Sequence, residues 1–219
     1  MKWLTGFIEW LTGLGKPAPK ESSPTVVTPP PKPRLELAVD VSGSRSWKGI
    51  CWHHSASPDK VTRDWDGIVK YHTSHRVDFN IVTPEEFERR QANNQGKVFQ
   101  KPWKAVGYHG GTELVNGEPI FQWGRSLSMV GAHAGVAGVS NQFNEDFIGL
   151  CCIGNYDAVS PDPKLWEFNL ALTRTLMDVF KISKEEVIGH REVFDRLKIP
   201  RQKSCPGLKF DMNQFRAEI

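Results

Sequence analysis

The sequence has no run of about 20 apolar residues, the length that a membrane-spanning helix requires, and it contains only four cysteines among 219 residues. Cys51 lies in the apolar run GICWHH, and Cys151 and Cys152 are adjacent in FIGLCCIG. Neighbouring side chains on a strand point to opposite faces, so a disulfide framework is not expected. We interpret these three cysteines as buried thiols and consider Cys205 separately.

The sequence also lacks an excess of charge outside its first 34 residues. Lysine and arginine exceed aspartate and glutamate by 28 to 25, and residues 1–34 hold five basic and two acidic side chains. Residues 35–219 are therefore neutral, which argues against nucleic acid as a partner because phosphate neutralisation supplies most of that affinity. What is present is enough apolar sequence for one sizeable core, including eight tryptophans.

Residues 3–14, WLTGFIEWLTGL, place their large apolar side chains on one helical face and Thr5, Glu9 and Thr12 on the other. The pattern predicts an amphipathic helix that contacts a membrane interface or a partner protein. A helix packed on the domain's own surface, or an unfolded segment, fits the same pattern. Glu9 splits the apolar region and no small-x-small cleavage site follows, so the segment is a poor signal peptide. We expect cytoplasmic synthesis and release by another factor.

A proline-rich segment follows, with seven prolines in residues 16–34 and few large apolar side chains. Such a stretch cannot bury a core and should form an extended linker. The predicted organisation is therefore a helix in residues 1–15, a linker in residues 16–40 and a folded domain in residues 41–219.

Within the folded domain, apolar runs alternate with helical patterns. Strands are expected to end at the pair His53 and His54 and again at His190, and FIGLCCIGNY should be a central buried strand. Asn116-Gly117 is typical of a hairpin turn. Strands interleaved with helices predict an α/β fold with a central mixed β-sheet flanked by helices.

Helix starts are expected at Thr62, as a cap, and at Thr83-Pro84, and a last short helix is expected over residues 211–217. The longest helix should run from Pro163 to about Lys181. Its apolar face is predicted to comprise Leu165, Phe168, Leu172, Leu176 and Val179.

A metal site is suggested by one segment near the end of the chain, in which His190, Lys203 and Cys205 lie close in sequence. Hydrolytic zinc needs three protein ligands, and imidazole and thiolate are its preferred donors. The third ligand would come from the His53-His54 pair. Alternation puts His53 on the face of Cys51 and His54 on the other, but it does not say which face carries the metal. Lys203 and Tyr108 are candidates for stabilising an oxyanion.

The series WHHSAS, KYH, PWKAVGYH, FQWGR, VGAH, FIGLCCIGNYD, IGHREV and KSCPG resembles the zinc-dependent N-acetylmuramoyl-L-alanine amidases, which include amidase-type phage lysozymes and peptidoglycan recognition proteins. The resemblance covers residues about 47–210. It implies a central mixed sheet flanked by helices with a substrate groove across one face. It also implies zinc-dependent hydrolysis of the amide between N-acetylmuramic acid and L-alanine in peptidoglycan.

Residue by residue, the resemblance implies that His53, His190 and Cys205 are zinc ligands and that Tyr108 and Lys203 assist catalysis. His133, in VGAH, matches a position beside the groove, and we list it with His54 as a substrate-binding candidate. Two departures from the compact phage enzymes are an extra segment at about residues 76–101, for which we expect a role as a groove wall, and a longer connection from His190 to Cys205.

The sequence thus predicts a zinc amidase of the phage endolysin type, a monomer that lyses the host cell by degrading its wall. It would act at the cell wall or in the periplasm after release, with peripheral membrane or protein contact through residues 3–14. The alternatives are a non-catalytic muropeptide-binding module, and a protein whose active part is the N-terminal helix itself.

Overall fold

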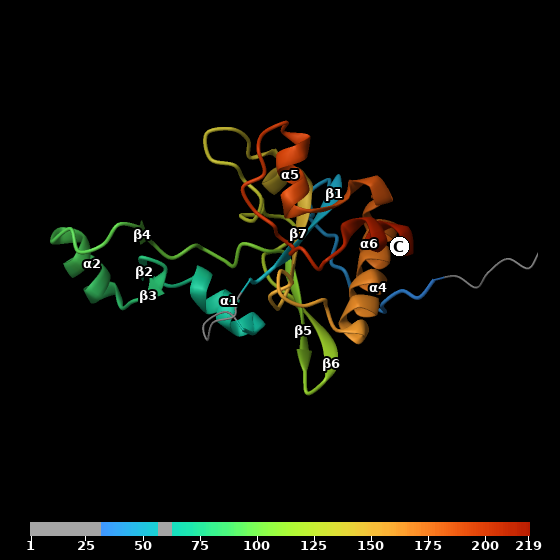
Figure 1. Ribbon diagram of the computed structural model, residues 1–219, viewed down its shortest axis with the longest axis horizontal. Coiled ribbons are helices and arrows are strands. Elements are labelled where there is room, and N and C mark those ends of the chain that lie inside the picture. Colours follow the sequence, from blue (N-terminus) through green and yellow to red (C-terminus); the bar gives the residue numbers. More distant parts are fainter. Residues whose placement is uncertain (1–31, 57–62) are drawn as a thin grey trace, which may run out of the picture. The chain divides into compact units, whose positions relative to one another are not determined.

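The sheet that organises the molecule has five strands. The computed structural model describes residues 32–56 and 63–219, and residues 32–219 form one compact unit. The strand order is β6-β5-β7-β1-β8, and Figure 1 labels the first four of these strands. The strands are β1 (Gly49–His54), β5 (Gly110–Val115), β6 (Glu118–Trp123), β7 (Phe147–Cys152) and β8 (Val187–Gly189). Because β6 is antiparallel to β5 and the other pairs are parallel, the sheet is mixed, as predicted.

The carboxyl ends of the parallel strands meet at one edge of the sheet. In β1, His53 pairs with Cys151 of β7, and Trp52 pairs with Gly189, the last residue of β8. The sequence prediction that FIGLCCIGNY is a central strand is confirmed, because β7 lies third of five and is buried throughout. The chain leaves β1 and β8 at neighbouring points, which brings residues distant in sequence together.

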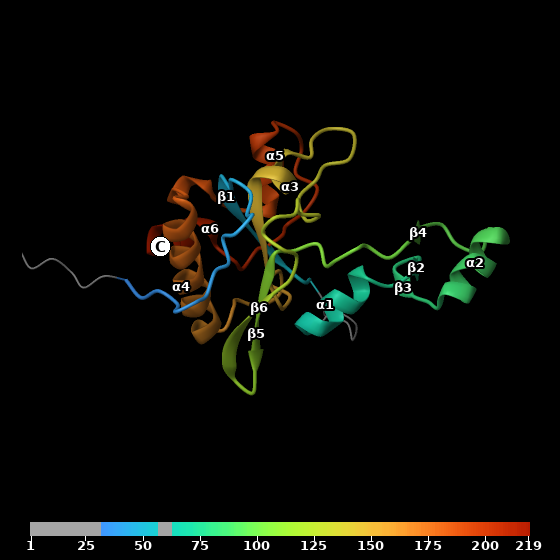
Figure 2. The same ribbon diagram turned by 180° about the vertical axis from the view of Figure 1, so that it is seen from behind.

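Helices cover both faces of the sheet, as Figures 1 and 2 show from opposite sides. On one face lie α4 (Pro163–Phe180) and α6 (Met212–Glu218), against the largest core cluster. On the other face lie α1 (Trp65–His72), α3 (Gln142–Asp146) and α5 (His190–Arg196), with two smaller clusters. This arrangement matches the flanked mixed sheet expected from the sequence.

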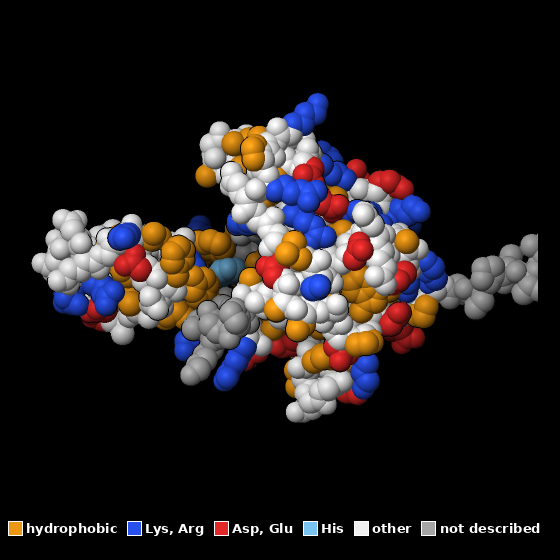
Figure 3. Space-filling model, in the orientation of Figure 1, with side chains coloured by type: hydrophobic (Ala, Val, Ile, Leu, Met, Phe, Trp, Pro, Cys, Tyr) orange, Lys and Arg blue, Asp and Glu red, His pale blue; other side chains and the backbone are white. Residues whose placement is uncertain are grey.

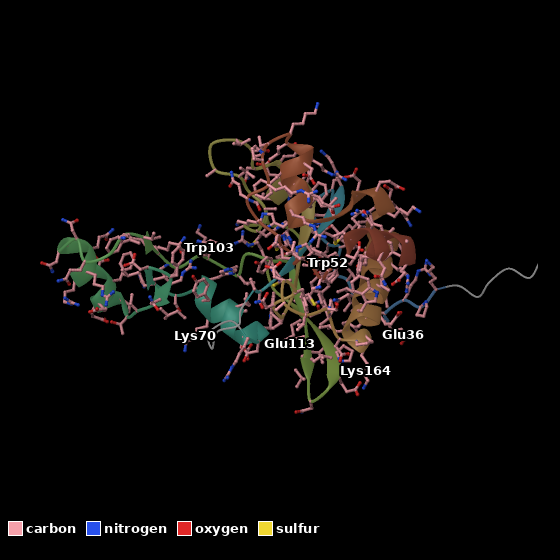
Figure 4. The ribbon with its side chains drawn as sticks, viewed as in Figure 1. Glu36, Trp52, Lys70, Trp103, Glu113 and Lys164 are labelled. Atoms are coloured by element: carbon pink, nitrogen blue, oxygen red, sulfur yellow. The ribbon has the colours of Figure 1, made fainter. Side chains whose placement is uncertain are left out.

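The alternation predicted for β1 is present. Trp52, labelled in Figure 4, is fully buried against α4 and α6. Its indole stacks on Phe210, and its Nε1 donates to Thr173 Oγ1 at 3.2 Å. Cys51, on the opposite face, packs with Phe143 and other residues of a separate cluster. All four cysteines are free, and Cys51, Cys151 and Cys152 are buried as expected.

The segment of residues 76–101 forms a small unit of its own. Its strands β2 (Arg76–Val77), β3 (Asn80–Ile81) and β4 (Phe99–Gln100) make a three-stranded sheet, which packs with α2 (Pro84–Ala92). Thr83 caps α2 as predicted, since its hydroxyl accepts the Glu86 N–H at 3.2 Å. Phe87 is the buried centre of this unit, and its ring contacts those of His75 and Phe99.

Three local expectations need correction. Helix α1 begins at Trp65 with Asp64 as its cap, because Asp64 Oδ1 accepts the Gly67 N–H at 2.7 Å; the Thr62 cap is wrong. Strand β8 ends at Gly189, and His190 is the first residue of α5. Val179 of α4 is 39% exposed, whereas the sequence predicts that it faces inward. The buried face of α4 is rotated slightly from the predicted one, so that Phe180 packs on the core instead of Val179.

Other expected elements are found close to their predicted positions. The Asn116-Gly117 turn joins β5 to β6 with both residues at positive φ, 53° and 80°, as a tight hairpin requires. Helix α4 begins at Pro163, and Lys181 follows it in the left-handed conformation. Helix α6 occupies the last short helical segment.

Residues 32–40, which the sequence analysis places in the linker, lie against the folded domain. Leu35, Leu37 and Val39 pack on the core cluster, and the Leu35 N–H donates to Thr175 Oγ1 of α4 at 3.0 Å. These three apolar side chains alternate along the segment and so share a side. The predicted helix in residues 3–14 and most of the linker lie outside the described residues. Within the described part of the chain, no helix is long and apolar enough to cross a membrane.

Candidate metal centre

Two histidines lie at the shared carboxyl edge of β1 and β8. His53 is the fifth residue of β1, and His190 opens α5 directly after β8. Their side chains are almost fully buried and their ring centroids are 4.6 Å apart. The proximity follows from the parallel pairing of β1 with β8, which delivers both residues to one point.

Cys205 reaches this point on the loop between α5 and α6, which is tied down by backbone-directed hydrogen bonds. The Arg191 N–H donates to Cys205 O at 2.7 Å, and the Arg191 guanidinium donates to the carbonyls of Ser204, Gly207 and Phe210. From the other side, Asp157 accepts the Ser204 hydroxyl at 2.8 Å and the Leu208 N–H at 2.9 Å. Arg191 and Asp157 therefore hold the part of the loop that contains Cys205.

The side chains of His53, His190 and Cys205 form a group whose ligand atoms all lie within 4.8 Å of one another. His53 Nδ1 is 3.6 Å from Cys205 Sγ. A tetrahedral zinc ion with a nitrogen at ~2.0 Å and a sulfur at ~2.3 Å separates those two ligands by roughly 3.5 Å. Two imidazoles and one thiolate are also a donor set that zinc favours, so these residues fit a zinc ion.

A second group, Cys51, His53 and His133, shares His53 with the first. Here His53 Nε2 is only 2.9 Å from His133 Nδ1, a hydrogen-bond distance. These two nitrogens already satisfy each other, and Cys51 is fully buried and does not line the main cavity. The His53, His190 and Cys205 group is therefore the better metal centre of the two.

His54 belongs to neither group. Its Nδ1 accepts the Tyr156 N–H at 3.2 Å, and its ring stacks on that of Tyr156, on the opposite side of β1 from Cys51. The choice between His53 and His54 that the sequence leaves open therefore favours His53 on geometry.

Burial sets the protonation of the three candidate ligands. Desolvation, helped by neighbouring His190, holds the pKa of His53 well below its ordinary value, and burial lowers the pKa of His190 to about 3. Both imidazoles are neutral at pH 7 and keep a lone pair for a metal. Burial raises the pKa of the Cys205 thiol to about 12. The thiol therefore carries a proton until a cation replaces it.

A cavity of about 660 Å³ opens over this centre. All seven residues singled out from the sequence line it, namely His53, His54, Tyr108, His133, His190, Lys203 and Cys205. Lys203 is exposed and its positive charge contributes to lowering the pKa of both His53 and His190. The Tyr108 ring lies 5.1 Å from that of His53, and burial raises the pKa of its hydroxyl well above the ordinary value.

The cavity wall also includes residues to which the sequence analysis assigns no role. His72, at the end of α1, accepts the Gly107 N–H on Nδ1 at 3.1 Å and stacks on Trp103 with centroids 4.6 Å apart. Burial, then the charge of Arg76, lowers the pKa of His72 to about 4. The neutral ring therefore carries its hydrogen on Nε2. His72 lies in the motif KYH and Trp103 lies in the motif PWKAVGYH. These motifs were the sequence signal that could have identified both residues.

None of the described cavity-lining residues comes from residues 76–101. Residues on both sides of the segment line the cavity, namely His72 before it and Trp103 after it. Figure 4 labels Trp103. Arg76 packs beneath these flanks, with its guanidinium 4.3 Å from the Tyr71 ring centroid and 5.5 Å from that of Trp103. The segment thus supports one wall from behind rather than forming it.

Acidic and basic side chains are interspersed on the surface face drawn in Figure 3. This agrees with the neutral charge of residues 35–219. The face shown therefore has no continuous basic surface that would attract a polyanion.

Comparison with solved structures found several to which this chain is similar. N-acetylmuramoyl-L-alanine amidase LysC from Clostridium intestinale is 21% identical, with 79% of this chain and 86% of that chain covered and a TM-score of 0.45. Bumblebee PGRP-SA is 20% identical, with coverages of 76% and 78% and a TM-score of 0.47. Amidase AmiD from E. coli, solved with an anhydromuropeptide, is 14% identical, with coverages of 84% and 61% and a TM-score of 0.46. A search of curated proteins found no match.

Comparison with models of protein families also found a match. It is the model described as N-acetylmuramoyl-L-alanine amidase, and it aligns with residues 43–208. That range contains the whole candidate centre and all the residues that line the cavity. Since the match spans well over half of the chain, the protein belongs to the N-acetylmuramoyl-L-alanine amidase family.

Proposed function

We propose that the protein is a zinc-dependent amidase that hydrolyses the bond between N-acetylmuramic acid and L-alanine in peptidoglycan, in the manner of a phage endolysin. The proposal rests above all on one observation, the gathering of His53, His190 and Cys205 ligand atoms within 4.8 Å at the base of a cavity. A volume of about 660 Å³ is sufficient for a sugar with part of its peptide.

His53, His190 and Cys205 would hold the zinc ion. When bound, zinc supplies a Lewis acid that lowers the pKa of water toward ~7 and polarises a carbonyl. The two neutral imidazoles are ready to donate their lone pairs, whereas the Cys205 thiol must first lose its proton.

Tyr108 and Lys203 are proposed to act on the scissile amide. The Tyr108 hydroxyl stays protonated because its pKa is raised by burial, so it can donate a hydrogen bond to the carbonyl oxygen as that atom gains negative charge. The Lys203 ammonium lines the same cavity and can stabilise the same charge. His54, also in the lining, remains a candidate contact for the substrate.

The site of action is part of the proposal. We infer synthesis in the cytoplasm and action on the cell wall after release, as a monomer, with residues 3–14 contacting a membrane or a partner. Peptidoglycan is the proposed partner, and the neutral charge of residues 35–219 supports a ligand other than nucleic acid.

The test is hydrolysis of purified peptidoglycan with and without a chelator, followed by mass analysis of the products. The proposal expects stem peptides with a free L-alanine amino group, glycan strands of unchanged length, and loss of both products when zinc is removed. Binding to peptidoglycan without hydrolysis by the zinc-loaded protein would favour the muropeptide-binding alternative. Cleavage within the glycan or the peptide would exclude the proposed bond.

A further inference from the structure

Both ring nitrogens of His133 are already engaged within the protein. Nε2 lies 3.1 Å from the carbonyl oxygen of Phe147, and Nδ1 lies 2.9 Å from His53 Nε2. His133 lines the cavity, but the residue is only 9% exposed. Neither ring nitrogen is free for a substrate, and both hydrogen bonds join the His133 ring to other parts of the protein.

The carbonyl group of Phe147 determines which atom is the donor in each of the two His133 hydrogen bonds. A carbonyl oxygen only accepts, so His133 Nε2 must carry the hydrogen. In a neutral imidazole the other nitrogen, Nδ1, is then an acceptor. The His53 Nε2 that faces it must therefore be the donor, which leaves His53 Nδ1 without hydrogen. This unprotonated Nδ1 is the atom 3.6 Å from Cys205 Sγ.

The ring of His133 is held in one orientation by its surroundings. A Cβ atom at Gly149 would meet the His133 ring at 2.3 Å, and one at Gly131 would meet it at 2.4 Å. The ring therefore occupies a slot that exists because both residues lack a side chain. The backbone is fixed as well, since Asn144 Oδ1 accepts the N–H groups of His133 and Ala134 at 2.7 Å each.

We propose that His133 is a positioning residue that fixes the tautomer of His53, through the chain of hydrogen bonds from Phe147 O to His133 to His53, so that His53 presents its bare Nδ1 to the metal. This inference rests on the proposed zinc centre. A metal-ligating histidine commonly donates its second N–H to a partner that sets its orientation, and loss of such partners lowers metal affinity by about 10–100-fold.

The direct test is a long-range proton–nitrogen NMR spectrum of the metal-free, histidine-labelled full chain. The expected result is hydrogen on Nε2 and none on Nδ1 of His53, with the same pattern for His133. A His53 ring with hydrogen on Nδ1 would overturn the inference, whether or not the protein binds zinc.

A pair of substitutions separates the tautomer effect from simple packing. In His133→Asn the side-chain oxygen can take the place of Nδ1 and accept from His53, whereas in His133→Gln the amide reaches the place of Nε2 and the acceptor is lost. Zinc affinity, measured by competition with a chelator, should fall about 10–100-fold in His133→Gln and stay within about threefold of the unaltered protein in His133→Asn. Equal losses in both variants would assign His133 to packing alone.

His75→Gln is the matched control, because its ring contacts Phe87 beside the small sheet and does not line the cavity. It should leave zinc affinity unchanged, and thermal unfolding of the metal-free variants reports whether each one folds. If the unaltered protein binds no zinc, the proposed function fails. If it binds zinc but the His133 pair behaves alike, only the present inference fails.

Discussion

At the residue scale, the centre depends on a few side chains whose chemistry burial has adjusted. His53 and His190 are kept neutral and Cys205 is kept protonated, so the metal-free centre carries no net charge among its three ligands. Placing a bare charge at a buried site is costly, and this arrangement avoids it until a cation arrives.

We expect Cys205→Ser to lose zinc and hydrolysis together, because a hydroxyl is a poor replacement for a thiolate ligand. Metal content by elemental analysis and product release from peptidoglycan would be measured on the same preparation. A variant that still cleaves the wall without bound metal would contradict the zinc mechanism.

Lys203→Ala should keep its zinc but hydrolyse peptidoglycan about 100-fold more slowly, since the ammonium is proposed to stabilise a developing oxyanion. Lys209→Ala is the control, because Lys209 is exposed in the same loop but does not line the cavity. Equal turnover in both variants would assign Lys203 to the solvated surface.

Zinc binding should release about one proton at pH 7. The pKa of the Cys205 thiol is raised to about 12, whereas that of His190 is lowered to about 3, so the thiol is the group that loses a proton. Zinc affinity should therefore rise about tenfold for each pH unit between roughly pH 6 and 8. Calorimetry in buffers of different protonation enthalpy counts the proton, and a buffer-independent heat would contradict this assignment.

At the element scale, the loop between α5 and α6 determines where Cys205 lies. Arg191 donates to three carbonyls of this loop, and Asp157 accepts from Ser204 and Leu208. Hydrogen bonds to a charged group contribute more than neutral ones, so this pair of residues can fix a long irregular segment. The connection from His190 to Cys205 is therefore well held.

Arg191→Leu should lower the free energy of unfolding of the metal-free protein by about 2 kcal/mol and weaken zinc binding, because the loop carbonyls lose their donor. Arg201→Leu is the control: Arg201 pairs with Asp195 at the surface, where loss of an ion pair changes stability by at most about 1 kcal/mol. Urea unfolding and a zinc titration test both variants. If Arg191→Leu binds zinc normally, the loop is placed by other contacts.

At the scale of the whole molecule, residues 32–219 form one compact unit. Arg34 pairs with Asp178 of α4, and the Arg174 guanidinium donates to Pro33 O at 3.0 Å, so the folded part begins several residues before the boundary expected at residue 41. The apolar residues of the 32–40 segment, sparse in sequence, still cover part of α4.

Deleting residues 1–31 should leave hydrolysis of purified peptidoglycan unchanged, since the compact unit and its centre are retained. Lysis from within an expressing cell should fall if the segment at residues 3–14 delivers the enzyme to a membrane or a partner. Zymography and the turbidity of an expressing culture measure the two effects. Loss of hydrolysis on purified walls would instead give the segment a part in catalysis.

The sequence by itself determined features that depend on a few neighbouring residues. The opposite faces of Cys51 and Trp52, the Thr83 cap and the Asn116-Gly117 turn follow from local periodicity and turn chemistry, and each is present. Its ordered motifs also indicated the family. Local patterns were less able to locate helix ends, since Asp64 rather than Thr62 caps α1. They also misplaced the edge of the buried face of α4, since Val179 is exposed.

Only the tertiary structure decided which side chains meet. His53 and Cys205 are 152 positions apart, and the parallel pairing of β1 with β8 and the tied loop bring them to 3.6 Å. Which face of β1 lies next to that loop decides that His53 rather than His54 joins the centre. It also decides that both His133 nitrogens have partners inside the protein. Such relations are set by packing across the whole sheet, and no window of the sequence contains them.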